Sequence, residues 1–136
     1  MDKYLQNVYN TQDWLKCVST NGGWKVQEKS LAALRATLQL LRNKLPTETS
    51  SYLGDQLPPM IREMYYKENA LNYNLLINME EDSFSESMEK YLKPRTDIEP
   101  EEAAYAVFKT LAHKISKEAI SKIKAKLPEN IRCLWD

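Results

Sequence analysis

The sequence predicts an all-α protein of two tandem four-helix repeats packed into one compact, bundle-like domain. The stretch from Leu57 to Tyr66 returns in altered form as the last stretch of the chain, 127–136. Leucines at helical spacing form a long apolar stripe in the first half. The chain has only three glycines, which favours helices. An internal repeat constrains the whole fold before any single element is assigned.

The repeat also predicts the domain organisation. Its two copies are 70 positions apart, as from Leu57 to Leu127, and the residues that recur are mostly small or apolar. Such residues serve a shared fold more readily than a unique site. We therefore expect a single domain over residues 1–136, with repeat one at 11–66, a linker at 67–82 and repeat two at 83–136.

The first repeat should open after a short polar arm at residues 1–10. Asn10 or Thr11 is expected to cap a short helix at about 12–19. A second helix, at about 26–44, carries the strongest periodic signal in the chain. Its apolar stripe consists of Leu31, Leu34, Leu38, Leu41 and Leu45.

Prolines punctuate the rest of this repeat. Pro46 ends the second helix, and Thr47 is expected to cap a third helix at about 48–56. Pro58 and Pro59 suit the start of a fourth helix, where a missing N–H costs nothing. The linker that follows is apolar enough to pack across both halves.

The second repeat shows matching start signals. Ser83 and Glu86 form a capping box, Pro100 opens the long helix, and Ser116 caps the next one. Pro128 starts the last helix. These positions predict four helices again.

Composition excludes some functional classes. The apolar content is 43% and the net charge is zero, so no global positive field attracts nucleic acid. No segment is apolar enough to span a membrane, and the N-terminus does not resemble a secretory signal. We expect a soluble, cytoplasmic protein that binds no membrane.

Residues with catalytic potential are sparse. His113 is the single histidine and does not by itself predict a metal site. Cys17 and Cys133 do not have the spacing of metal-binding or redox-active cysteines. A thiol–imidazole dyad would need these residues to be adjacent in space. No phosphate-binding loop is present. We therefore expect no cofactor, no metal and no catalytic residues, and lean against an enzyme.

One charged pair recurs in both repeats. Glu48 with Arg62 in the first repeat corresponds to Glu118 with Arg132 in the second. The favoured interpretation is a structural ion pair between the third and fourth helices of each repeat. The alternative is a doubled ligand-binding arginine.

Two regions differ between the repeats and are candidates for a partner surface. The first is aromatic, and Trp24, Tyr66 and Tyr73 are its candidates, because aromatic residues with a polar end are favoured at interfaces. Alternatively, they seal the junction between the repeats. The second region is basic and follows an acidic stretch at 80–102. Its candidates are Lys117, Lys122 and Lys124, which could instead form a plain solvated face.

The assembled residues resemble a bacterial family of uncharacterised two-repeat helical proteins, domain of unknown function family 2267. The resemblance rests on Trp14, Gly23-Trp24, the leucine-rich second helix, Tyr65-Tyr66 and the two Leu-Pro segments. Lys67-Glu68 stand where members often have Gly-Trp after the paired tyrosines. The resemblance implies a duplicated all-helical domain of bacterial type and brings no activity, cofactor or catalytic residue.

The leading functional hypothesis is a non-enzymatic protein-interaction or regulatory module with an unknown protein partner. The alternative is a small-molecule binder or enzyme that uses a cleft between the repeats, lined by Trp24, Tyr66 and Tyr73. Weak nucleic-acid binding through the Lys-rich C-terminal helices comes third and is disfavoured. The oligomeric state cannot be predicted from these patterns.

Overall fold

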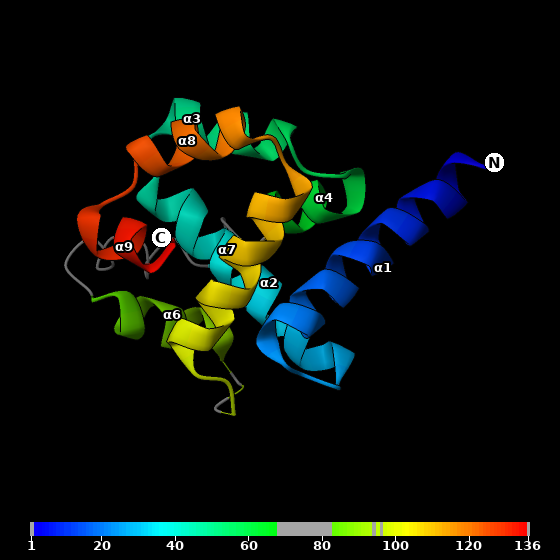
Figure 1. Cartoon of the computed structure of the whole chain (residues 1–136), viewed down its shortest axis with the longest axis horizontal. Coiled ribbons are helices and arrows are strands. Elements are labelled where there is room, and N and C mark those ends of the chain that lie inside the picture. Colours follow the sequence, from blue (N-terminus) through cyan, green and yellow to red (C-terminus); the bar gives the residue numbers. More distant parts are fainter. Residues whose placement is uncertain (1, 68–82, 94, 96, 136) are drawn as a thin grey trace.

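The computed structural model describes residues 2–67, 83–93, 95 and 97–135, and the regular structure within these ranges is entirely helical (Figure 1). The all-α prediction is confirmed for this part of the chain. The expectation that the linker packs across both halves concerns residues that lie outside the described ranges. Eight helices are described: α1 (Lys3–Gly22), α2 (Gln27–Lys44), α3 (Thr47–Asp55), α4 (Pro59–Lys67), α6 (Phe84–Leu92), α7 (Pro100–Lys114), α8 (Lys117–Ala125) and α9 (Glu129–Trp135).

The first helix is longer than expected. Residues 3–22 form one continuous helix in place of a polar arm and a short helix. Its N-cap is Asp2, whose side chain accepts a hydrogen bond from the Tyr4 N–H at 3.2 Å. Asn10 and Thr11 do not cap, because their side chains bond within the helix: Asn10 accepts from Gln6 at 3.3 Å, and Thr11 donates to the Asn7 carbonyl at 2.9 Å.

Most of the other predicted helix ends are confirmed. Ser83 Oγ accepts from the Glu86 N–H at 3.2 Å, and Ser116 Oγ accepts from the Ala119 N–H at 3.1 Å. Pro100 occupies the first turn of α7. Thr47 is the first residue of α3, so that Pro46 takes the N-cap position expected for Thr47.

Helices α2 and α7 form the centre of the core and pack against each other. On α2, Leu34, Leu38 and Leu41 are fully buried. Leu31, expected on the same stripe, is 37% exposed. The corresponding core of α7 contains Val107, Phe108 and Leu111. Each fully buried side chain of this kind stabilises the fold by about 1.5–3 kcal/mol relative to solvent exposure.

The outer helices cross from one half of the chain to the other. Helix α1 packs on α7, α6 packs on α2, and α3 lies beside α8 at one end of the molecule (Figure 1). The two halves are therefore interleaved. None of the helices in the described ranges is long and apolar enough to cross a membrane.

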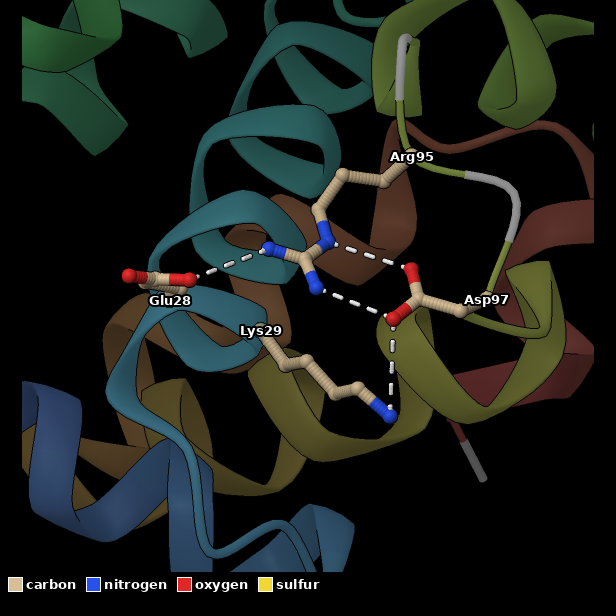
Figure 2. A network of polar contacts seen from close by, with 4 residues as sticks. All are labelled: Glu28, Lys29, Arg95 and Asp97. Carbon is tan, nitrogen blue, oxygen red and sulfur yellow. Dashed lines mark hydrogen bonds and ion pairs between the residues drawn. The ribbon is translucent and has the colours of Figure 1, made fainter.

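A surface ion network attaches the α6–α7 connection to the first turn of α2 (Figure 2). Arg95 donates to both carboxylate oxygens of Asp97, from Nε at 3.1 Å and from Nη2 at 2.9 Å. Its Nη1 lies 3.8 Å from Glu28, and Lys29 Nζ lies 3.6 Å from Asp97. Two positive and two negative groups are thus matched within one cluster.

Candidate interaction surface

The contact between α3 and α8 brings together an aromatic ring and a lysine. Lys122 Nζ lies 5.3 Å from the centroid of the Tyr52 ring. The same amine is 3.5 Å from Glu118 one turn earlier on α8. Tyr52 is half-buried and packs against the core. A cation held over an aromatic face keeps its charge available to solvent while its stem covers apolar surface.

A groove of about 300 Å³ runs beside this pair. Thr49 and Tyr52 on α3 form one wall, and Lys122 and Ala125 on α8 form the other. Its accessible wall is almost entirely apolar, and Glu48 and Lys126 stand at its edges. The groove can therefore accept an apolar side chain within a charged rim. We call the groove and the exposed lysines of α8 the α3–α8 face.

The basic character of this face comes from α8. Lys117, Lys122 and Lys126 are exposed, whereas Glu118 is the acidic residue of that helix. Lys124 is half-buried and has interactions of its own. Of the predicted lysines, Lys122 lines the groove together with Tyr52, whereas Lys117 is exposed on α8 but does not line it. The sequence predicted the lysines as site residues, whereas Tyr52 was not among the aromatic candidates.

Two of the predicted aromatic candidates, Trp24 and Tyr66, do not line this groove. Trp24 is half-buried and packs against the core. Its ring lies so close to Gly22 that a Cβ there would come within 2.5 Å of it. Tyr73 lies outside the described residues. Trp24 therefore contributes to packing rather than to an exposed partner surface.

Tyr66 is held from two sides. Its hydroxyl lies where a Cβ at residue 54 would collide with it, so Gly54 allows the close approach. On the other side the Arg42 guanidinium lies 4.8 Å from the Tyr66 ring centroid and donates to the Tyr66 carbonyl at 2.7 Å. Arg42 also donates to the Tyr65 carbonyl at 3.2 Å. The ring thus secures the end of α4 against α3 and α2.

The expected pairs of Glu48 with Arg62 and of Glu118 with Arg132 are not formed, which corrects the sequence prediction. Arg62 donates to backbone carbonyls of the α3–α4 turn instead, at 2.9 Å to Gly54 and 3.0 Å to Leu57. Arg132 forms its ion pair with Glu129 on its own helix, and Glu118 pairs with Lys122. Carbonyls at a helix end lack helical partners, which explains why a nearby arginine binds them.

Residues with catalytic potential lie on three helices, with Cys17 on α1, His113 on α7 and Cys133 on α9. No cluster of three or more His, Cys, Asp or Glu side chains that could hold a metal is found among the described residues. His113 is exposed on α7, and Cys133 is exposed with its thiol 3.6 Å from the Asn130 carbonyl. Cys17 accepts from the Asn21 amide at 3.6 Å.

Comparison with known proteins identifies a matching family but indicates no activity. The model of the family described as "Uncharacterized conserved protein (DUF2267)" matches residues 11–134. No curated protein matches the chain.

Proposed function

We propose a function on the basis of the surface features described above, because this chain belongs to the DUF2267 family, whose members are described as uncharacterised. The proposed function is a non-enzymatic protein-interaction module that binds an acidic segment of another protein through the α3–α8 face. The observation that carries this proposal is the apolar groove beside the Tyr52–Lys122 pair. An apolar slot flanked by Lys122 and Lys126 fits a segment in which carboxylates flank an apolar side chain.

Charge supports this choice of partner. Two exposed lysines, Lys117 and Lys122, lie on α8, and a third, Lys126, is the residue that caps its C-terminus. An acidic partner is attracted to them, and complementary charge raises the rate of encounter. Tyrosine supplies rigid contact area with a polar tip, as residues central to interfaces often do.

The lining of the groove favours a protein segment over a small molecule, although its volume alone is compatible with both. At about 300 Å³, the groove is at the lower end of ligand pockets, which span roughly 300–1,000 Å³. Its rim also lacks a converging set of buried polar groups. Nucleic-acid binding is less favoured, because the net charge of the chain is zero and no global positive field attracts phosphates.

We also propose that the fold arose as two tandem copies of a four-helix unit. Helix ends recur at the offset of 70 positions: α2 ends at Lys44 and α7 at Lys114, while α3 and α8 start at Thr47 and Lys117. The packing of α1 on α7 and of α6 on α2 is reciprocal in the same way. Such a duplication places the α3–α8 face on the approximate symmetry axis.

An NMR titration tests the proposed function. The probe is a synthetic peptide in which glutamates alternate with leucines, and its control replaces the glutamates by lysines. We expect the acidic peptide to shift amide resonances of α3 and α8, and the basic peptide to leave them unchanged. Equal shifts with both peptides, or shifts spread over the whole molecule, would contradict the proposal.

The matched variants keep the change in net charge equal. Lys122→Glu with Lys126→Glu reverses the charge of the groove, whereas Lys93→Glu with Lys109→Glu makes the same change at two exposed positions, the C-cap of α6 and α7. The first pair should abolish the shifts, and the second should preserve them.

A further inference from the structure

The first half of α1 presents apolar side chains to solvent. In Figure 1 this end of the helix extends away from the body of the molecule. Tyr4 is 67% exposed, Leu5 45% and Tyr9 57%. A helix of three turns is marginal in water without packing, and large apolar side chains grouped on one element mark an interaction site.

The spacing on α1 defines one continuous seam. Asp2, Leu5, Tyr9, Gln12 and Lys16 are separated alternately by three and four positions, which is the spacing of a coiled-coil contact face. The seam is acidic at its first residue and basic at its last. Lys25 lies near the basic end, across a groove from Lys16.

That groove lies beside the seam and has a volume of about 520 Å³. One wall contains Tyr9, Gln12, Asp13 and Lys16, the four positions of a helix that form a hole for a knob from a neighbouring helix. Lys25 and Gln27 belong to the groove lining from the other side. The molecule therefore carries both an exposed leucine and a hole suited to it on the same seam.

We propose that a second copy of this chain occupies the seam, with the two α1 helices antiparallel. Leu5 of each copy then enters the hole at Tyr9, Gln12, Asp13 and Lys16 of the other, and the two Tyr9 side chains meet at the two-fold axis. Asp2 of each copy lies near the basic end of the other seam.

Charge and symmetry favour this occupant over a different protein. Because the charge changes sign along the seam, only an antiparallel copy places opposite charges together at both ends. The same surface serves both partners, as a closed two-fold dimer requires. This interface is separate from the α3–α8 face, so that either proposal can fail without the other.

Sedimentation equilibrium of the full chain tests the dimer. We expect the wild type to dimerise reversibly and Leu5→Glu to weaken the dimer by roughly tenfold or more, as for a central interface residue. Leu31→Glu is the matched control, because Leu31 is similarly exposed on α2, and it should leave the dimer unchanged. A wild type that remains monomeric at all concentrations overturns the proposal and assigns the seam to a different protein.

Cysteine crosslinking tests the orientation. In a background with Cys17→Ser and Cys133→Ser, Tyr9→Cys should form an intermolecular disulfide upon mild oxidation, because the two positions meet at the axis. Asn7→Cys, on the opposite side of α1, should remain monomeric on a non-reducing gel. Equal crosslinking of both variants, or crosslinking of Asn7→Cys alone, contradicts the antiparallel seam.

Discussion

Lys114 Nζ on α7 donates to Asp13 Oδ2 on α1 at 2.8 Å, although the two residues are 101 positions apart. Asn21 on α1 likewise donates to Thr110 on α7 at 3.3 Å. Exposed ion pairs stabilise a fold by only about 1 kcal/mol or less. These polar contacts therefore show that α1 lies against α7 but contribute little to the stability of that packing. The packing itself buries Val18 on α1 and Val107 on α7 completely.

The interleaved packing predicts that neither half folds alone. Fragment 1–67 lacks α7, the main partner of α1, and fragment 83–136 lacks α2, the main partner of α6. Each fragment should show weak helical circular dichroism without cooperative unfolding, and an equimolar mixture should recover both. Sharp cooperative unfolding of either fragment alone would refute this arrangement.

Local signals predicted most of the helices. Ser83, Ser116 and Pro100 act within one turn of the chain, so their roles could be read from neighbouring residues alone. The start of α1 could not, because Asn10 and Thr11 are capable caps in sequence but bond inside the helix when Asp2 provides the cap. The pairing of α1 with α7 depends on tertiary contacts that no local pattern contains.

Removing the buried hydroxyl of Tyr65 should destabilise the fold. This hydroxyl donates to the Ser50 carbonyl at 2.9 Å and lies 2.7 Å from Ser50 Oγ. Tyr65→Phe should lower the free energy of unfolding by about 1 kcal/mol. Urea unfolding at neutral pH measures this, and Tyr105→Phe at an exposed position should leave the free energy unchanged.

The same residue predicts a loss of stability in alkali. Burial raises the pKa of Tyr65 from 10.0 to about 12. Between these values the unfolded chain has released the proton and the native protein has not, so stability is lost as the pH rises from about 10 to about 12. The loss is on the order of 2 kcal/mol, and Tyr65→Phe should lack it. An identical alkaline decline in that variant would count against this assignment.

Acid should weaken the fold through Asp97. Hydrogen bonds from Arg95 lower the pKa of Asp97 from 3.8 to about 2. The unfolded chain therefore binds this proton first, and the stabilisation present above about pH 4 is lost as the pH falls to about 2. The urea midpoint of Asp97→Asn should vary less across this range than that of the wild type. Asp13, whose pKa Lys114 also lowers, should account for part of the remaining variation.

An aromatic stack packs the last helix, α9, against α7. Trp135 lies parallel to Phe108, with ring centroids 4.4 Å apart and an interplanar angle of 5°. Its indole Nε1 is buried and has no hydrogen-bond partner within the part of the chain that the structure describes. Trp135→Ala should cost about 2–4 kcal/mol, whereas Trp135→Phe keeps a stack, removes the unpaired N–H and should cost less than about 1 kcal/mol. Thermal unfolding distinguishes the two, and equal losses would show that the stack does not stabilise α9.

The candidate site was only partly predictable from the sequence. Lysines on one helix are visible as a run, so Lys117 and Lys122 could be named in advance. The partner ring could not, because Tyr52 is brought to Lys122 by the contact between α3 and α8, which are 70 positions apart. The partner of Arg62 was predicted wrongly for a similar reason. The backbone carbonyls of the α3–α4 turn that accept its hydrogen bonds are brought near it by the geometry of the turn.

Site-specific photo-crosslinking in source cells is the most direct test of the proposed interaction surface. A photoreactive phenylalanine replaces Thr49 in the groove, and Glu102, exposed on α7, is the control position. We predict a crosslinked protein with an acidic segment at the Thr49 position only, and its loss when Lys122→Glu and Lys126→Glu are added. Absence of a product from Thr49, the same product from Glu102, or a product that survives the charge reversal would contradict the account.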